Sequence, residues 1–365
     1  NRTTIMNHPI PLPLKGDCLF IDNSGMTTYM SCPRQGAYSY SLKRKPNRPS
    51  PALTFGGAIH EALETRYRIH HDKPLIDAQM FDDMVDSMIA HYEKEEADLD
   101  TSEWRNVSYA IQTLSEYVTK YRYEQPNTYY HDGEPCVEIP FALPIGSMEV
   151  NATIWVTDPD INNGEPTTRY VSTVTIYVTG KIDMIVKRNG NCWLLDHKTT
   201  SIGGPSFFDE FQTSTQFKGY KWAAQKIIGQ PIAGIIINAL MCRKPKADGT
   251  TNYTFERNQI PIHDDHVDEW QNTFLTTVYT FIQQHVDQEQ FNSPEQSFPM
   301  NTPWCKGKYG TCPFFDVCTL RPYQREQMIY SGLYTDNTWS PIKEEQRVNL
   351  GKNRPVNLPN ILLTD

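Results

Sequence analysis

The chain has 365 residues, a length typical of about two domains or of one large α/β domain with insertions. Hydrophobic residues make up 38% of the chain and aromatic residues 12%, which is enough apolar bulk for a packed core. A net charge of -9 argues against indiscriminate binding of polyanions over the whole surface, but it permits a local basic groove.

The first residues lack the basic start and the apolar run of a signal peptide. The longest apolar run, residues 232–242, is too short to span a bilayer. We therefore expect an intracellular, cytoplasmic protein. Eight cysteines in a large chain without an export signal favour metal ligation or free thiols over a disulfide framework.

Residues 1–26 are rich in proline and polar residues and predict an extended arm. A helix is expected over residues 27–42, with Cys32 inside it. Arg34 and the basic residues after it are interleaved with tyrosines. Such a segment is either a solvated face or a groove for a nucleic acid strand, in which cations contact phosphates and rings stack on bases.

Apolar residues four apart predict a helix over residues 53–71, which begins at a glycine pair. His60 and Glu64 are also four apart and share a second face of this helix. A histidine at such a position is by default packed or exposed without a special role. Residues 76–123 continue as amphipathic helices, and we interpret their methionine and aromatic stripes as core.

Strand-like runs flank a turn-rich segment between residues 137 and 178. Residues 180–198 then predict a hairpin, because apolar residues alternate before a turn at 188–190 and form a run after it. A helix over 213–228 and a buried strand over 232–240 follow. A strand, a helix and a strand in this order imply a right-handed crossover and a parallel pair, so the fold class is α/β.

The predicted hairpin carries Asp183, Asp196 and Lys198 to one end of the sheet. Two carboxylates and a lysine suit metal-assisted phosphodiester cleavage, because the acids hold a divalent cation and the ammonium lies near the water or the phosphate. The alternative is a plain hairpin with solvated acids at its end, and spacing alone leaves both open.

One more helix is expected at residues 265–289, and the tail after it contains Cys305, Cys312 and Cys318. The chain has no internal repeat, no Walker A sequence and no dinucleotide-type glycine fingerprint. ATP hydrolysis by this chain is therefore not expected.

Four short motifs occur in a fixed order: GAIHEALE, GKID, LLDHK and QFKGY. Each is weak alone, but together with the predicted strands and helices they resemble the PD-(D/E)XK nuclease superfamily. The likeness is to the RecB-like exonuclease branch, which includes CRISPR-associated adaptation nucleases and phage-encoded exonucleases. It covers residues from about 27 to 320.

The resemblance implies a central mixed sheet flanked by helices, a restriction-endonuclease-like core with a helical insertion and a cysteine-pinned C-terminal tail. The expected parts are an extended arm at 1–26, a helical region with the metal-ligand histidine at 27–136, a nuclease core sheet at 137–260, a C-terminal helix and cysteine region at 261–325, and a tail at 326–365.

The resemblance also implies a site for Mg²⁺ or Mn²⁺. Its ligands are the side chains of His60, Asp183 and Asp196 and the backbone carbonyl of His197. Lys198 is expected to orient or deprotonate the attacking water, or to stabilise charge on the phosphate. The acid before x-Lys is Asp196 here and commonly Glu in this branch, and the motif allows both. Carboxylates suit these hard cations, and an imidazole ligand shifts the preference toward Mn²⁺.

Further residues have implied roles around this site. Gln216 and Tyr220 are expected on its DNA-binding side, and Arg34 is a candidate contact to the substrate. Glu64 is expected to support a second metal or to hold His60 in place.

In the iron-sulfur members of the family, one N-terminal cysteine and three C-terminal cysteines hold a [4Fe-4S] cluster. Cys32, Cys305, Cys312 and Cys318 match that pattern. The last two have the expected spacing, but six residues separate Cys305 from Cys312, where the compact form has two. Structural Zn²⁺ and free thiols stay open as alternatives, because four thiolates also suit zinc.

The expected function is a metal-dependent deoxyribonuclease, most simply an exonuclease on single-stranded DNA or DNA ends in recombination, repair or phage DNA processing. It lacks a helicase motif, so it is expected to work alone or with a separate helicase or recombination protein. A structure-selective or nicking endonuclease is one alternative. A non-catalytic DNA-binding or interaction protein that retains the fold is the other.

Overall fold

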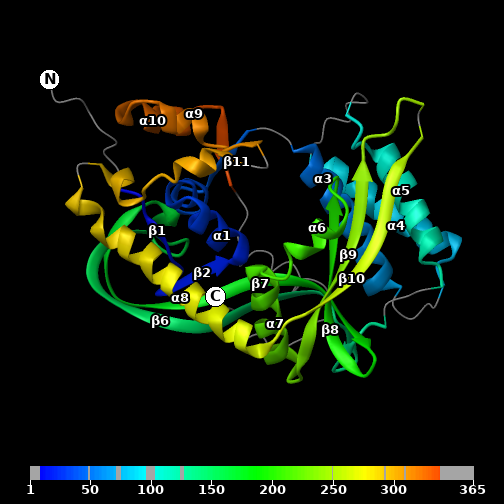
Figure 1. Cartoon of the computed structure of the whole chain (residues 1–365). Coiled ribbons are helices and arrows are strands. Elements are labelled where there is room, and N and C mark those ends of the chain that lie inside the picture. The colour runs from blue at the N-terminus through cyan, green and yellow to red at the C-terminus, as the bar shows by residue number, and fades with distance from the viewer. Residues whose placement is uncertain are drawn as a thin grey trace. The chain divides into compact units, whose positions relative to one another are not determined.

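The computed structural model describes residues 9–47, 50–70, 75–95, 103–123, 127–248, 250–291, 293–307 and 310–337 (Figure 1). The chain divides into two compact units. Unit 1 contains residues 1–48, 141–180 and 268–347, and unit 2 contains residues 49–140, 181–267 and 348–365. The start of the predicted arm, residues 1–8, and most of the predicted tail, residues 338–365, lie outside the described residues.

A mixed sheet of seven strands has the order β1-β6-β7-β8-β9-β10, with β2 also paired to β7. Its strands are β1 (Leu12–Pro13), β2 (Cys18–Asp22), β6 (Val137–Thr157), β7 (Thr167–Arg188), β8 (Asn191–Thr200), β9 (Ile232–Arg243) and β10 (Asn252–Pro261). Helices flank this sheet, so the predicted restriction-endonuclease-like α/β fold is confirmed.

The predicted hairpin at residues 180–198 forms within unit 2. β7 and β8 pair in antiparallel fashion, with Met184 opposite Leu195. The turn residues Asn189 and Gly190 both have positive φ, 52° and 80°. Two successive positive φ angles match the twist of paired strands, which is why an Asn-Gly turn closes the hairpin. After it, helix α7 (Thr215–Ile228) leads into β9, which runs parallel to β8 as the crossover predicted.

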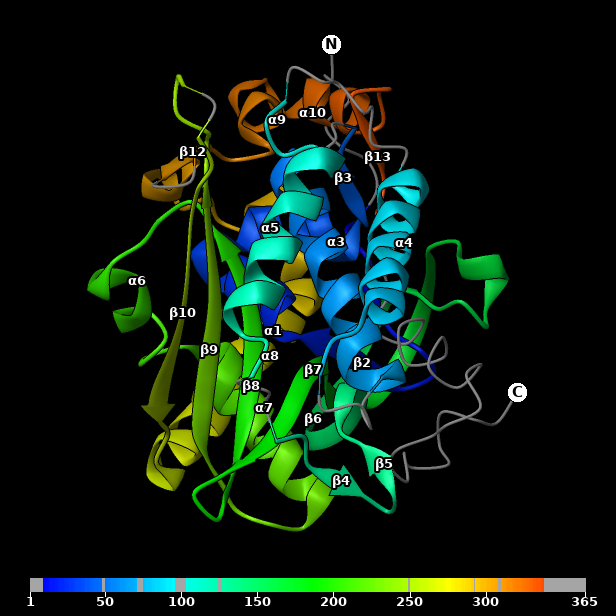
Figure 2. The same cartoon turned by 90° about the vertical axis from the view of Figure 1, so that its right-hand side faces the viewer.

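Three helices of unit 2 cover one face of β8, β9 and β10 (Figure 2). They are α3 (Pro51–Glu64), α4 (Ala78–Lys94) and α5 (Val107–Lys120), and α3 continues as a π-helical turn, η2 (Thr65–Ile69). The predicted stripes are core, because Met80, Met84, Met88 and Leu114 are completely buried between helices and strands. The short elements of this unit are β4 (Tyr130–His131), β5 (Glu134–Pro135) and α6 (Pro205–Asp209).

Unit 1 places its N-terminal helices beside short C-terminal elements. Its helices are α1 (Asn23–Ser31), α2 (Pro33–Gly36), the π-helical turn η1 (Ala37–Ser41), α9 (Phe315–Thr319) and α10 (Pro322–Ile329). Its small strands are β3 (Arg44–Pro46), β11 (Lys306–Gly307), β12 (Gly310–Thr311) and β13 (Tyr334–Asp336). The long helix α8 (Asp264–Val286) and short 3-10 turns at Asp287–Gln290, Pro294–Ser297 and Thr302–Cys305 precede these C-terminal elements.

Two predicted elements differ from the structure. The helix expected over residues 27–42 is broken at Cys32, whose φ of -158° and ψ of 108° are extended, because a residue that precedes proline disfavours the helical region. The strand runs expected between residues 137 and 157 form one strand, β6, despite Pro140 and Pro144. β1 pairs only with the last residues of β6, so Pro140 and Pro144 lie outside that pairing. Proline is tolerated where a strand edge has no hydrogen-bonding neighbour.

In the part of the chain that the structure describes, no helix combines the length and the apolar character needed to cross a membrane.

Candidate metal centre and active site

The end of the β7–β8 hairpin brings the predicted acids and lysine together. Asp183 is 9% exposed and Asp196 is 2% exposed. The backbone N–H of His197 donates to Oδ2 of Asp183 at 2.9 Å, which fixes that carboxylate against β8. Nζ of Lys198 lies 2.7 Å from Oδ2 of Asp196. The hairpin end therefore holds two contacts, one between Asp183 and the backbone of His197 and one between Lys198 and Asp196.

Helix α3 adds His60 to this group. Nδ1 of His60 lies 3.5 Å from Oδ2 of Asp183. The approach depends on Gly56, because a Cβ at this position would lie only 2.9 Å from Oγ1 of Thr199 on β8. A residue without a side chain lets the helix pack closely on the strand. One turn later, His60 points at the hairpin end.

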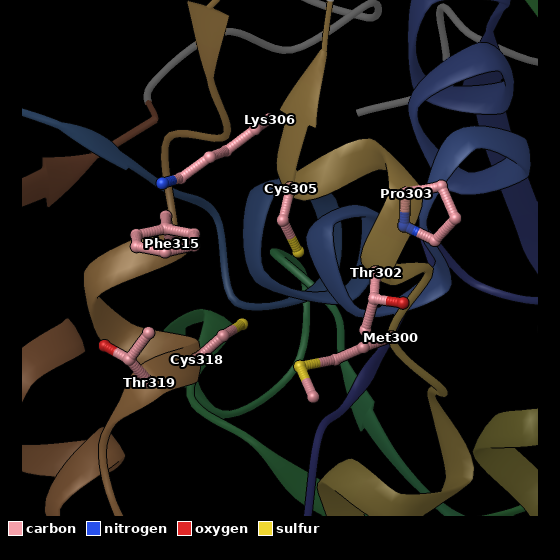
Figure 3. Close-up of a pocket in the computed structure, with 8 residues that line it drawn as sticks. All are labelled: Met300, Thr302, Pro303, Cys305, Lys306, Phe315, Cys318 and Thr319. Carbon is pink, nitrogen blue, oxygen red and sulfur yellow. The ribbon is translucent and has the colours of Figure 1, made fainter.

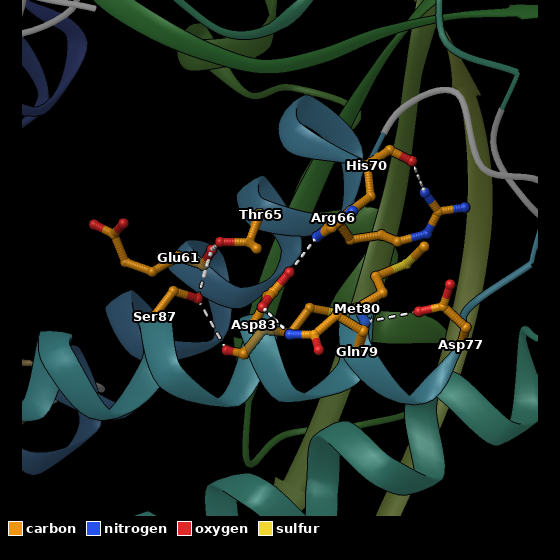
Figure 4. Close-up of polar contacts among 10 residues, drawn as sticks. Glu61, Thr65, Arg66, His70, Asp77, Gln79, Met80, Asp83 and Ser87 are labelled. Carbon is orange, nitrogen blue, oxygen red and sulfur yellow. Dashed lines mark hydrogen bonds and ion pairs between the residues drawn. The ribbon is translucent and has the colours of Figure 1, made fainter.

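Helix α4 fixes the position of α3 through close packing and polar contacts (Figure 4). The carbonyl of Glu61, next to His60, accepts from Oγ1 of Thr65 at 3.0 Å and from Oγ of Ser87 on α4 at 3.4 Å. A Cβ on Gly57 would collide with the ring of His91 on α4. The helix that carries His60 is thus held from the side away from the sheet.

Glu138 on β6 lies beside these residues, and the sequence analysis did not single it out. Single ligand atoms of His60, Glu138 and Asp183 all lie within 4.8 Å of one another. Glu138 is 4% exposed, and its Oε2 lies 2.5 Å from Nζ of Lys181. The signal in the sequence is an acid inside the apolar run VEIPF, which a solvated strand face does not explain.

The carboxylates of the site repel one another. Burial raises the pKa of Asp183 well above its ordinary value, and Asp196 and Glu138 raise it further, while Lys198 opposes them. Burial lowers the pKa of His60, although Glu138 and Asp196 act in the other direction, so its imidazole is neutral near pH 7. A histidine binds a metal ion through its neutral imidazole, so burial already keeps His60 in its ligating form.

Lys198 is charged in this site. Burial acts to lower its pKa, but Asp196 and Asp183 outweigh burial and raise the pKa of Lys198 above its ordinary value. Among the protein side chains alone, Lys198 is therefore a stable ammonium group.

A buried polar network holds the imidazole of His197. Nδ2 of Asn238 lies 2.7 Å from Nδ1 of His197 and donates to the hydroxyl of Tyr117, also at 2.7 Å. Nε of Arg257 donates to Oδ1 of the same asparagine at 3.1 Å. The ring of Tyr67 stacks on His197 with a centroid distance of 5.8 Å. These contacts fix the residue whose carbonyl is the predicted backbone ligand.

The donor set fits a hard divalent cation. Carboxylate oxygens are the ligands that Mg²⁺ and Mn²⁺ prefer, and one imidazole is compatible with Mn²⁺. Three carboxylates, Glu138, Asp183 and Asp196, face two ammonium groups, Lys181 and Lys198. A bound cation would offset the repulsion among these carboxylates.

The substrate-side residues have different placements. Gln216 and Tyr220 are half-buried on α7, the helix whose Phe217 ring lies 5.4 Å from Nζ of Lys198. Glu64 forms an ion pair of 2.6 Å with Arg68. The roles predicted for these residues stay predictions.

Arg34 is buried in unit 1. Its Nε donates to the carbonyl of Phe298 at 3.1 Å, and its second guanidinium nitrogen donates to the carbonyl of Glu295 at 3.0 Å. This placement favours a role in holding the C-terminal segment. Its predicted contact with substrate stays a prediction.

The four cysteines of the predicted cluster all belong to unit 1. Burial raises the pKa of Cys312, and the nearby Cys32 and Cys305 add to the shift. Burial also raises the pKa of Cys318 to about 11, with Cys312 and Cys32 again contributing and Arg34 opposing. These mutual effects show that the thiols gather in one region. Cys305 and Cys318 point into a pocket of about 390 Å³ that Met300 also lines (Figure 3).

A small hairpin lies between Cys305 and Cys312 and brings these two cysteines together despite their long spacing in the sequence. β11 and β12 pair between these residues, with Lys306 opposite Thr311. The N–H of Cys312 donates to the carbonyl of Cys305 at 2.9 Å. The extra residues therefore return the chain to its starting point, and the two cysteines are neighbours.

A comparison with curated proteins finds no match. Among solved structures, one match is a chain described as "Crystal structure of SSO0001", with 11% identity and a TM-score of 0.24, covering 74% of this chain and 90% of that chain. A profile of the PD-(D/E)XK nuclease superfamily matches residues 23–319, most of the chain, including the hairpin and His60. The order of motifs, the mixed sheet and this match agree, and the chain belongs to the PD-(D/E)XK nuclease superfamily.

Proposed function

We propose that the protein is a metal-dependent deoxyribonuclease that acts as an exonuclease on single-stranded DNA or DNA ends. The observation that carries this proposal is the pair of close contacts at one end of the hairpin, His60 with Asp183 and Lys198 with Asp196. Members of the superfamily use divalent metals. A binding module has no need for two buried carboxylates, an imidazole and an ammonium group in contact.

Each residue has a distinct task in this proposal. Asp183, Asp196 and His60 hold the cation, and the carbonyl of His197 completes the set. A bound divalent cation supplies Lewis acidity and offsets negative charge on the scissile phosphate. Lys198, kept as an ammonium group by Asp196, orients the attacking water and stabilises the charge that develops on the phosphate.

The direct test uses Asp183→Asn and an end-labelled single strand with Mn²⁺. Loss of one ligand is expected to reduce cleavage at least about a hundredfold. Asp86→Asn, an exposed acid on α4, is the matched control and is expected to cleave like the wild type. Undiminished cleavage by Asp183→Asn would refute the proposal.

The two nuclease alternatives are separated by substrate form. A covalently closed single-stranded circle has no end, so an exonuclease leaves it intact while it degrades the linear strand of the same sequence. Cleavage of the circle favours a structure-selective or nicking endonuclease. Metal-independent binding of both forms without cleavage under any divalent ion favours the non-catalytic alternative.

We further propose that Cys32, Cys305, Cys312 and Cys318 hold a [4Fe-4S] cluster. Two observations support this: the pocket beside Cys305 and Cys318, and the hairpin that makes Cys305 and Cys312 neighbours.

The spectrum of protein purified without oxygen tests this second proposal. A brown solution with broad absorption near ~400 nm supports the cluster. A colourless protein that contains zinc overturns it. We also propose that the protein acts in recombination, repair or phage DNA processing, with a separate helicase or recombination protein as a partner. Co-purification from the source cells tests the partner.

A further inference from the structure

We propose that Glu138 is a ligand of the divalent cation in this chain and that Lys181 and Arg68 position it. This inference rests on the proposed function, because it adds a donor to the same site. Its basis is the arrangement of His60, Glu138 and Asp183, whose ligand atoms lie within 4.8 Å of one another. That spacing lets one cation contact all three.

The side chain of Glu138 is held from one side. Nζ of Lys181 lies 2.5 Å from Oε2 of Glu138. Since a carboxylate has two oxygens and several lone pairs, one ion pair leaves acceptor capacity for a cation. Lys181 is 39% exposed, whereas the side chain of Glu138 is 5% exposed, so the lysine reaches the acid from the solvent side.

The backbone of Glu138 is held as well. Its φ is 49°, in the left-handed region that a residue with a side chain rarely adopts. The guanidinium of Arg68 donates to the carbonyls of Val137 and Glu138, both at 2.8 Å. Arg68 is in turn paired with Glu64 on α3 at 2.6 Å. The helix that carries His60 thus fixes the strand segment that carries Glu138.

A purely structural ion pair accounts poorly for this arrangement. Pairing with Lys181 alone would not require the ligand atoms of Glu138, His60 and Asp183 to lie within 4.8 Å of one another. A third carboxylate beside two others is a disadvantage for stability and an advantage for binding a cation. The geometry therefore assigns Glu138 to the metal centre, and it gives Glu64 a role through Arg68.

The test measures metal binding by the full chain without DNA. Binding of Mn²⁺ is followed by the loss of the free-ion electron paramagnetic resonance signal. Glu138→Gln keeps the shape of the side chain and removes its charge, and we expect affinity to fall by about tenfold or more. Glu61→Gln is the matched control, because it removes the same charge from the residue next to His60. The carboxylate of Glu61 faces His91 and lies outside the cluster of His60, Glu138 and Asp183.

A second readout separates ligation from a through-space effect of charge. Eu³⁺, a hard cation that prefers oxygen, reports its bound waters through luminescence lifetimes in H₂O and D₂O. Loss of one side-chain ligand is expected to add about one bound water in Glu138→Ala and none in Glu61→Ala, since alanine has no oxygen to bind the cation. If Glu138→Gln does not fold, Glu138→Asp serves instead, because it keeps the charge but withdraws the oxygens by one methylene.

The outcomes distinguish this inference from the proposed function. Wild-type binding that is lost in Asp183→Asn but unchanged in Glu138→Gln overturns only the role of Glu138. Weaker binding by Glu138→Ala without an added water also overturns it, because the acid then acts at a distance. Absence of Mn²⁺ binding by the wild type overturns the metal site itself.

Discussion

Nδ2 of Asn238 on β9 lies 2.7 Å from Nδ1 of His197 on β8, at a site from which water is excluded. A donor at this position makes Nδ1 of the imidazole the acceptor and places the ring proton on Nε2. The same amide nitrogen also donates to Tyr117, and the amide oxygen accepts from Arg257. One side chain thus organises the polar layer beneath the predicted metal ligands.

Replacing this side chain is expected to affect both stability and activity. Asn238→Leu removes one hydrogen-bond partner from each of His197, Tyr117 and Arg257, although the last two stay bonded to each other. Leaving the buried ring nitrogen of His197 without this partner costs about 1–3 kcal/mol of unfolding free energy. Urea denaturation measures this loss, and Asn258→Leu on the exposed face of β10 is the control. A loss equal in the two variants would refute the role of the network.

Lys198→Met is expected to reduce cleavage by about a hundredfold or more, because it removes the ammonium group beside the predicted metal ligands. Binding of single-stranded DNA is expected to persist, since one contact among many is lost. Single-turnover cleavage and fluorescence anisotropy measure the two effects. Lys226→Met, at the other end of α7, is the control, and equal losses in both variants would contradict a catalytic role.

A divalent cation is expected to stabilise unit 2. The buried carboxylates of Asp183 and Asp196 repel one another, and a bound cation removes that cost. A ligand that binds only the folded state adds about 2.7 kcal/mol at a hundredfold excess over Kd. Thermal unfolding with EDTA and with Mn²⁺ measures the effect. Asp183→Asn is expected to lose the shift, and an undiminished shift in that variant would place the cation elsewhere.

Unit 1 contains a histidine that makes stability depend on pH. His285 is buried, with Nε2 at 3.0 Å from Oγ of Ser41 and Nδ1 at 2.8 Å from the carbonyl of Phe281. Burial lowers the pKa of His285 from 6.5 to about 4. Between these values the unfolded chain binds more protons than the folded one, so stability is lost as the pH falls from 6.5 toward 4, by about 3 kcal/mol in all.

His285→Gln isolates this effect. Asp22 acts in the opposite direction, because burial raises its pKa from 3.8 to about 6 and the folded state then binds more protons in that range. Total stability therefore mixes the two groups, whereas the difference between wild type and His285→Gln contains only the histidine. Chemical denaturation at pH 4.5 and 7 is expected to show a difference that shrinks at the lower pH. A constant difference would contradict the shifted pKa.

The parts of the fold that local sequence determines were predictable. An Asn-Gly turn between alternating apolar residues predicts the β7–β8 hairpin, and the spacing of His60 places it on a helix face. The contact of His60 with Asp183 is nonlocal, and only the resemblance to a known family implied that they share a site. The register that brings them to 3.5 Å follows from packing at Gly56.

Glu138 and Cys32 mark where sequence reasoning stops. The left-handed backbone of Glu138 is imposed by Arg68, a residue 70 positions away, and no pattern in the strand predicts it. The helix break at Cys32 has a local signal, Pro33, which the predicted continuous helix over residues 27–42 leaves out of account. Tertiary contacts override a local preference in the first case, and a single proline breaks the expected helix in the second.

The β11–β12 hairpin has a consequence for how this protein's relatives are recognised. Because antiparallel pairing returns the chain to its starting point, residues can be inserted between Cys305 and Cys312 in pairs without separating the two thiols. Evolution can therefore vary this interval as freely as any surface loop. A search that requires a fixed cysteine interval discards such chains, whereas one that allows a hairpin-length insertion keeps them.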